Sequence, residues 1–369
     1  MLPLLIWCAW VFAVGLGVGS FLNVLIARLP YEKSIVWPGS RCFTCLQSIR
    51  LRDNVPILGY LLLRGRCRSC GAKFSPRYLG IELLTGLAFV GLFLFEIVYN
   101  LPRTVGLAEV SVQLRMGTPP VWSLIFFAYH ALLVSLLLAA AMIDAQHRII
   151  PPSITYVGTL LGLVGAAFMP WPWPGDAALA AEWQAKPMWF LVEDWGRIPM
   201  GLQPWPFWGP TPDWAAPGTW QLGLTNGLVG ALAGMFLIRA VKFLFEVGLG
   251  REALGLGDAD LMMMAGAFLG WQPVVLALFI GAAAALMIKL PMLLIEVIRG
   301  KSSESELPFG PGLALGVVIT WLGWRWIGPS VQFLFFDTVM LGLVVVIMGG
   351  GMLGAGLLLR KPNDEEVSS

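Results

Sequence analysis

The sequence is poor in charged residues. Of its 369 residues only 12% are Asp, Glu, Lys or Arg, while 57% are hydrophobic. An ordinary soluble domain carries roughly 25% charged residues, so this shortage predicts an integral membrane protein. The net charge of +2 is also small and gives no reason to expect nucleic acid as a partner.

Two further features are missing. There is no internal repeat, and no G-x-G-x-x-G turn marks a soluble nucleotide-binding unit. The first apolar run has neither a basic stretch before it nor a clear small-x-small cleavage site. We therefore interpret this run as a retained anchor and not as a removable signal peptide.

Long apolar runs are what the sequence has in abundance. About 20 apolar residues cross a hydrocarbon core of ~30 Å, and a break at Gly270–Pro273 splits one run into a hairpin of a short and a longer helix. We expect an all-α polytopic membrane protein with about eight or nine transmembrane helices. The expected spans lie near residues 4–27, 79–99, 121–143, 153–170, 222–245, 260–298 (two crossings), 311–328 and 334–359.

The positions of Lys and Arg give the expected orientation, because these residues favour short cytoplasmic loops. They are concentrated between residues 28 and 78 and on flanks that fall on the same side, which places the N-terminus outside. The expected regions are a first transmembrane helix (1–27), a cytoplasmic four-cysteine loop (28–78), a membrane-embedded domain (79–359) and a polar cytoplasmic tail (360–369).

An outer insert at 171–221 interrupts the membrane-embedded domain. Residues 170–220 contain nine of the seventeen tryptophans and many prolines, so this stretch is not one regular helix. Tryptophan favours the headgroup level of a bilayer. The insert is interpreted as an interfacial cap on the outer leaflet, or alternatively as a docking surface for a partner.

The four-cysteine loop contains two C-x-x-C knuckles, Cys42 with Cys45 and Cys67 with Cys70, separated by 21 residues. This spacing is typical of a zinc ribbon. Four thiolates form a closed tetrahedral site, so the expected Zn²⁺ is structural and not catalytic. Two disulfides are the alternative, but they rarely persist in the reducing cytoplasm. Cys8, inside the first span, is expected to act as a small hydrophobe.

Two aspartates are expected at the cytoplasmic membrane edge: Asp144 at the end of one apolar run and Asp258 at the start of another. Carboxylates are costly at such positions and suggest function. A pair sharing one proton can act as an aspartic-protease dyad. The alternatives are that Asp144 pairs with Arg148 and that Asp258 caps the following helix.

The residues near these aspartates are expected to act locally, as space for a substrate or as parts of the helix ends and interior. Gly255 and Gly257 would let a substrate strand approach Asp258, and glycine also tolerates φ > 0. Asp260 is expected in the first turn of the helix, where it suits the dipole. His147 is expected to be solvated at a helix end, and His130 to be a hydrogen-bonded interior group.

Taken in order, these segments resemble the type IV prepilin peptidases, the GxGD membrane aspartic proteases. The resemblance covers most of the chain outside the two outer loops and the ends. It is carried by GSFLNVLIARLP (19–30), the two cysteine knuckles, DNVPILGYLLLRGRCRSCG (53–71), RYLGIELLTG (77–86), MID (142–144) with Pro151, GLGDADLMMMAGAFLGW (255–271) and LPFGPGLALG (307–316).

The resemblance implies cleavage of basic leaders from type IV prepilins or type II secretion pseudopilins, at the cytoplasmic side of the bacterial inner membrane, by Asp144 and Asp258. It also implies N-methylation with S-adenosylmethionine, associated with the four-cysteine loop.

Asp260 stands where the family usually has lysine, and the 171–221 insert is long for the family. A transporter or channel using the edge aspartates as an ion relay is the alternative function, and a zinc-ribbon docking protein with inert helices is the third.

Overall fold

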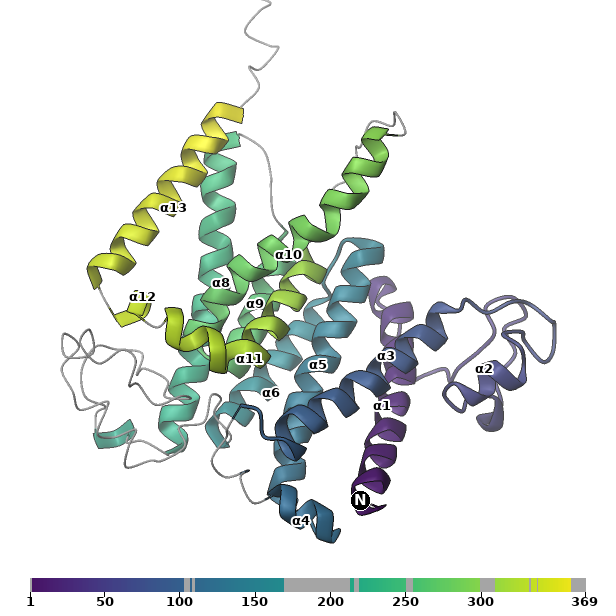
Figure 1. Ribbon diagram of the computed structural model, residues 1–369. Coiled ribbons are helices and arrows are strands. Elements are labelled where there is room, and N and C mark those ends of the chain that lie inside the picture. The colour runs from purple at the N-terminus through teal and green to yellow at the C-terminus, as the bar shows by residue number, and fades with distance from the viewer. Residues whose placement is uncertain are drawn as a thin grey trace, which may run out of the picture. The chain divides into compact units, whose positions relative to one another are not determined.

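A computed structural model of the chain describes residues 2–102, 107, 110–168, 213–215, 219–249, 255–298, 309–331, 333–336 and 338–359. The described part is helical and contains no β-strand, only isolated bridges (Figure 1). The chain forms two compact units, Met1–Ile154 and Thr155–Ser369. The all-α membrane architecture expected from the sequence is confirmed.

The first unit is built around three long helices. α1 packs along α3, and α5 contacts both. The elements of this unit are α1 (Leu2–Arg28), η1 (Leu29–Tyr31), η2 (Leu51–Asp53), α2 (Leu58–Leu62), α3 (Arg77–Leu92), the π-helical η3 (Phe93–Val98), α4 (Val110–Met116) and α5 (Val121–His147).

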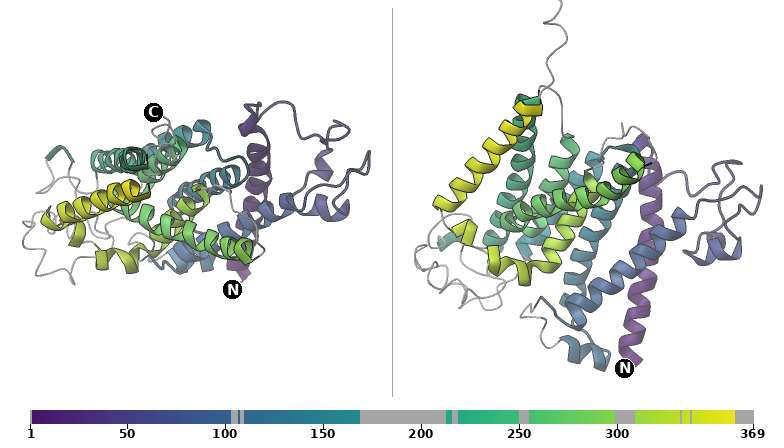
Figure 2. Two further views of the ribbon diagram at one scale, coloured as in Figure 1. Left: turned by 90° about the horizontal axis from the view of Figure 1, so that it is seen from above. Right: turned by 45° about the horizontal axis from the view of Figure 1, so that its top comes forward.

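Helices α1 and α3 lie side by side (Figures 1 and 2). Small residues at their contact let the two backbones approach closely. A Cβ added at Gly19 would lie 2.7 Å from the Cα of Glu82, closer than real carbon atoms stand. Close approach through small residues is typical of helix pairs in membranes, where no hydrophobic force drives helices together. The Asn23 side-chain amide adds a hydrogen bond of 3.0 Å to the Tyr78 carbonyl.

The connection from α5 to α6 (Pro152–Phe168) follows from local backbone rules. Arg148 adopts a left-handed conformation with φ 56°, and its N–H donates to the Asp144 carbonyl at 2.8 Å. Such a residue commonly ends a helix. Pro152 then occupies the first position of α6, where its missing N–H costs nothing.

The second unit contains the remaining helices. α8 packs most closely on α9, α10 packs on α11, and α13 contacts α8 (Figure 2). These elements are η7 (Asp213–Ala215), α8 (Trp220–Leu249), α9 (Leu256–Leu269), α10 (Trp271–Ile298), α11 (Gly310–Val331), α12 (Phe333–Phe336) and α13 (Thr338–Leu359).

The contact between α8 and α9 requires glycine. A Cβ at Gly266 would overlap the carbonyl oxygen of Gly230, and a Cβ at Gly230 would overlap that of Gly266. The break expected at Gly270–Pro273 is also confirmed, because Gly270 separates α9 from α10 with φ 80°. Glycine adopts this conformation without the penalty that other residues incur.

Five described helices are long and apolar enough to cross a membrane. They agree with the spans expected near 4–27, 79–99, 121–143 and 222–245 and with the second half of 260–298. Helix α6 and the segment Val339–Gly351 are shorter apolar helices, so the count of eight or nine crossings stays a prediction. Most of the insert 171–221 and the whole tail 360–369 lie outside the described residues.

Candidate functional site

The first candidate site is formed by the two cysteine knuckles, which adopt matching backbone conformations. In the first, the Leu46 N–H donates to the Cys42 carbonyl at 2.9 Å, and in the second the Gly71 N–H donates to the Cys67 carbonyl at 2.9 Å. Leu46 and Gly71 both have positive φ, 57° and 74°. Each C-x-x-C segment is therefore a tight turn that directs two thiols to one side.

The two turns bring all four sulfurs together. The Sγ atoms of Cys42, Cys45, Cys67 and Cys70 lie within 4.8 Å of one another. Cys42 Sγ lies 3.8 Å from Cys70 Sγ, and Cys45 Sγ lies 3.9 Å from Cys67 Sγ. Thiolates held at 2.3 Å from one Zn²⁺ in tetrahedral geometry stand about 3.8 Å apart. The donor set therefore fits a structural Zn²⁺, and the disulfide alternative does not fit these separations.

The thiols differ in acidity. The backbone N–H groups of Cys45 and Thr44 lower the pKa of Cys42 to about 6. The N–H groups of Cys70 and Ser69 likewise lower the pKa of Cys67. Although the Ala72 N–H acts to lower the pKa of Cys70, burial and the neighbouring thiols raise it to about 11. Thiolate is the form that binds metal, so these backbone donors prepare part of the ligand set.

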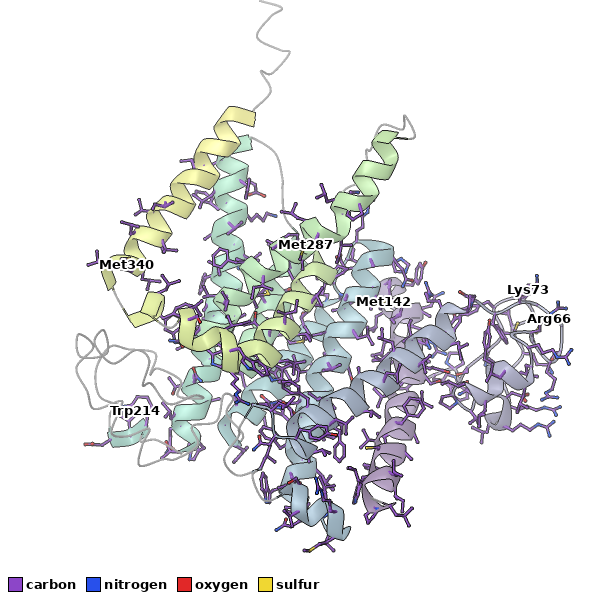
Figure 3. The ribbon with its side chains drawn as sticks, in the orientation of Figure 1. Arg66, Lys73, Met142, Trp214, Met287 and Met340 are labelled. Carbon is purple, nitrogen blue, oxygen red and sulfur yellow. The ribbon has the colours of Figure 1, made fainter. Side chains whose placement is uncertain are left out.

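Contacts outside the knuckles hold the loop in place. Arg68 forms a two-pronged ion pair with Asp53, with distances of 2.8 Å and 2.6 Å. The N–H of Ile57 donates to the Glu82 carboxylate of α3 at 2.7 Å. Figure 3 labels Arg66 and Lys73, whose antiparallel bridge closes the second knuckle. Glu82 was not predicted to hold the loop. The available signal was its charge, within the otherwise largely uncharged segment 77–86.

The second candidate site contains Asp144, in the last turn of α5. Its side chain is buried, with 7% relative exposure, and Figure 3 labels Met142 two residues before it. The Arg77 guanidinium at the start of α3 donates to the Gln146 side chain, and the His147 ring lies edge-on to Tyr31 with centroids 5.5 Å apart. His147 is thus at the helix end, as expected, but half-buried against Tyr31, a residue that the sequence analysis missed. The bond described between Arg148 and Asp144 is the backbone one, so their side-chain pairing stays an alternative.

Asp258 lies in the other unit, as the third residue of α9. Its side chain is likewise 7% exposed. The alternative that Asp258 caps the helix is wrong, because Gly255 occupies the capping position and α9 begins at Leu256. Gly255 does not use the tolerance of glycine for φ > 0, since its φ is −75°.

The glycine at 255 instead leaves space beside the carboxylate. A Cβ at Gly255 would lie 3.7 Å from Asp258 Oδ2. Gly257 is the second residue of α9 and is half-buried. An approach to Asp258 from this side would therefore depend on missing side chains and not on an unusual backbone.

Asp260 differs from its expected position. It is the fifth residue of α9, beyond the first turn, and its side chain is 8% exposed. A helix dipole acts mainly within the first turn, so this effect alone does not account for Asp260. Its burial was not predicted; it follows from the packing of α9 against α8.

His130 is an interior hydrogen-bonded group, as expected. Its Nδ1 lies 2.8 Å from one Glu96 carboxylate oxygen and 3.0 Å from the other, and both side chains are buried. Glu96 comes from the π-helical η3, so the pair connects η3 to α5. Buried polar groups in a membrane need such partners. Cys8 is a half-buried free thiol of α1.

Comparison with known proteins gives a family. A profile described as the bacterial peptidase A24 N-terminal domain matches residues 13–96, and one described as the type IV leader peptidase family matches residues 214–290. A prepilin leader peptidase/N-methyltransferase of Myxococcus xanthus (strain DK1622) is 31% identical over 316 residues, which is 86% of this chain and 72% of that protein. The chain belongs to the type IV leader peptidase family.

Other members of the leader peptidase family show similar agreement. The prepilin leader peptidase/N-methyltransferase of Klebsiella pneumoniae is 31% identical over 290 residues, covering 76% of this chain and 92% of the relative. A type 4 prepilin-like proteins leader peptide-processing enzyme of Escherichia coli O78:H11 is 30% identical over 325 residues, covering 83% and 90%. No solved structure matches the chain.

Family membership confirms the resemblance seen in the sequence. The leader peptidase described here is a membrane protease with apolar helices. The second profile includes Asp258, and the first includes all four cysteines. Family membership therefore favours a protease over the two alternative functions, an ion relay in a transporter or channel and a zinc-ribbon docking protein.

Proposed function

We propose that the protein removes the basic leader from type IV prepilins or pseudopilins, with Asp144 and Asp258 as its catalytic pair. The observation that carries this proposal is the burial of two carboxylates, each within one turn of a helix end. Both ends are expected at the cytoplasmic edge of the inner membrane. Water reaches that edge but not the bilayer centre, and hydrolysis requires water.

In the proposed reaction the two carboxylates share one proton. The ionised aspartate accepts a proton from water as the water oxygen bonds to the scissile carbonyl carbon, and the protonated aspartate donates a hydrogen bond to the carbonyl oxygen. The carbon–nitrogen bond then breaks, and the leaving nitrogen takes up a proton. The products are the free leader and a pilin with a new N-terminal amine.

The substrate can place its own bond at this depth. Its basic leader stays in the cytoplasm by the positive-inside preference, while the apolar helix that follows enters the bilayer. We further propose cleavage after a glycine, because a residue without a side chain can lie against Gly255 and Gly257. The new amine is then methylated with S-adenosylmethionine, in keeping with the names of the relatives.

The test uses purified protein in lipid nanodiscs with a purified prepilin. Asp144→Asn and Asp258→Asn should each lower the cleavage rate by about 10²–10⁴-fold or more, the usual range for acid–base groups. Asp260→Asn is the matched control on the same helix as Asp258 and should retain substantial cleavage. Near-normal cleavage by Asp144→Asn or Asp258→Asn would refute the assignment.

The substrate side of the proposal has its own test. Replacing the glycine before the scissile bond with valine should strongly reduce cleavage, whereas conservative changes in the apolar helix should have little effect. Mass spectrometry of the products identifies the bond that is cut. Efficient cleavage of the valine substrate at the same bond would contradict the steric explanation.

A further inference from the structure

A cavity of about 760 Å³ lies within the first unit, beside the end of α5. One wall is formed by residues 29–35 except Tyr31, which follow α1, and the other by residues 149–153, which link α5 to α6. Its volume is within the range of about 300–1,000 Å³ found for small-molecule sites. The cavity is not explained by the proposed peptide cleavage.

The backbone around this cavity is held in a defined form. The Arg28 guanidinium donates to the carbonyls of Ser34 at 3.0 Å, Pro38 at 2.7 Å and Gly39 at 3.2 Å. The Tyr31–His147 ring contact connects the two walls. A left-handed residue ends the helix at each wall: Glu32, with φ 54°, ends η1 within the first wall, and Arg148, with φ 56°, ends α5 just before the second. These contacts hold the backbone around the cavity in a defined conformation.

The lining combines four kinds of groups. Isoleucines and prolines supply an apolar surface, Ser34 and Ser153 supply hydroxyls, Glu32 supplies a carboxylate and Lys33 supplies an ammonium group. S-Adenosylmethionine carries partners for these groups in one small molecule: an adenine ring whose flat faces suit an apolar surface, a ribose diol, a carboxylate, and two cationic groups, the ammonium and the sulfonium. The residues present thus fit this methyl donor.

Charged groups of both signs surround the cavity. Arg28, Lys33 and Arg148 lie in or beside the walls, and Glu32 is the acidic residue among the lining residues. A carboxylate would be attracted to Lys33, and an ammonium or sulfonium group would be attracted to Glu32.

The cavity is also close to where the acceptor amine would form. Ile149 follows Asp144 by five residues, a stretch of chain that spans at most about 18 Å even when extended. We propose that this cavity binds S-adenosylmethionine for methylation of the new N-terminus, an inference that rests on the proposed function. In that transfer the amine lone pair bonds to the donor's methyl carbon, and the carbon–sulfur bond breaks with its electrons remaining on sulfur. The methylated ammonium can then release one proton to water, and S-adenosylhomocysteine is the second product.

The experiment measures binding directly, with tritiated S-adenosylmethionine and full-length protein in nanodiscs. Ile149→Trp should weaken binding by about tenfold or more, because the larger indole would take up part of the space between the two walls. The matched control is Ile125→Trp, also on an exposed isoleucine of the first unit but remote in sequence from both walls; the two side chains are 46% and 53% exposed. It should change binding by less than about twofold, as surface substitutions usually do.

Ultraviolet cross-linking of the same labelled donor, followed by peptide mapping, locates the site. The label should appear in residues 29–35 or 149–153. Label confined to another segment, or equal binding by Ile149→Trp and Ile125→Trp, would overturn the proposal. If Ile149→Trp abolished leader cleavage but kept full donor binding, the cavity would belong to the leader and the proposal would also fall.

Asp144→Asn separates this inference from the proposed function. The variant should lose cleavage but still bind the donor and become labelled at the cavity. If it cleaved normally while the wild-type label lay in the cavity, the catalytic assignment would fail and the binding site would stand.

Discussion

The cysteine cluster and the two aspartates differ in how far apart their residues lie in the sequence. Cys42 and Cys70 are 28 positions apart, and short turns within one loop bring all four sulfurs together. Asp144 and Asp258 are 114 positions apart and lie in different compact units. The geometry of the cysteine cluster is therefore fixed by local sequence, whereas the proposed catalytic pair takes one aspartate from each unit.

This difference decides how each site should respond to substitution. In the four-cysteine loop a bound Zn²⁺ would supply folding energy to a segment without a large core. In the helical units, glycines and buried side chains determine where a carboxylate lies. A change in one region should thus leave the defining property of the other region intact, and the following predictions test that independence.

The largest effect is expected for Cys42→Ser, which removes the most buried of the four ligands. Structural zinc in small peptides contributes an apparent 10–16 kcal/mol or so to folding. Zinc content, measured by elemental analysis, should fall from one ion per chain to nearly none, and residues 40–74 should lose protection from hydrogen exchange. The helices α8 and α9 should keep theirs.

Cys8→Ser is the control for the zinc experiment, because Cys8 lies in α1 away from the cluster. It should leave the metal content unchanged. Purified protein without zinc, prepared without chelator, would contradict the site, and loss of protection throughout α8 and α9 in Cys42→Ser would contradict the independence of the two regions.

A smaller loss, of stability and of cleavage, is expected from a substitution where α8 packs against α9. Gly266→Val would force a branched side chain against the Gly230 carbonyl, and overpacking of this kind typically costs about 1–3 kcal/mol. Thermal unfolding in nanodiscs should occur at lower temperature, and cleavage should fall because Asp258 is carried by the displaced α9. Zinc content should not change.

The control for this helix contact is Gly342→Val, since a Cβ at Gly342 of α13 meets nothing within 4 Å. It should lower the unfolding temperature much less than Gly266→Val. Equal destabilisation by the two variants would show that the cost is general to valine in these helices and not due to the α8–α9 contact.

A still smaller effect is expected for Gly255→Ala. The backbone at this position, φ −75° and ψ 148°, suits any residue, so stability should be unchanged. The added methyl would stand 3.7 Å from Asp258 Oδ2 and should reduce leader cleavage several-fold by narrowing the approach, mainly through KM. An unchanged KM and kcat would remove Gly255 from the proposed substrate path.

The sequence predicted these regions to different extents. The C-x-x-C spacing was sufficient for the sulfur cluster, because a tight turn determines where both thiols of a knuckle point. Apolar runs predicted the helices that contain Asp144 and Asp258. The first turn of α9 was less predictable: Gly255 occupies the capping position that the alternative interpretation gave to Asp258. Capping depends on backbone conformation within one residue, which residue type alone does not determine.

Contacts between distant segments were the least predictable. The Glu96–His130 pair, the Tyr31–His147 ring contact and the bond from Ile57 to Glu82 each join residues at least 25 positions apart. No periodic pattern marks such partners, since each depends on how helices are placed around the loop. The cavity beside α5 arises from two such segments and has no motif of its own.

The smallest effect is expected for Asp53→Asn, which weakens a contact inside the four-cysteine loop without removing a ligand. The two-pronged hydrogen bond from Arg68 holds the pKa of Asp53 below its usual value. A carboxyl whose pKa is lower in the folded state contributes stability that is present above the unfolded pKa, about 3.9, and is lost as the pH falls through the lower folded value. At neutral pH the variant should therefore release zinc to a chelator somewhat faster than wild type. This difference should shrink as the pH falls below the unfolded pKa of about 3.9, and it should vanish once the pH is below the lower folded pKa, where Asp53 of the wild type becomes protonated. Arg68→Gln should reproduce the effect, and the double variant should add little to either single one, because both changes remove the same ion pair. Additive effects on zinc release would show that the two side chains act separately.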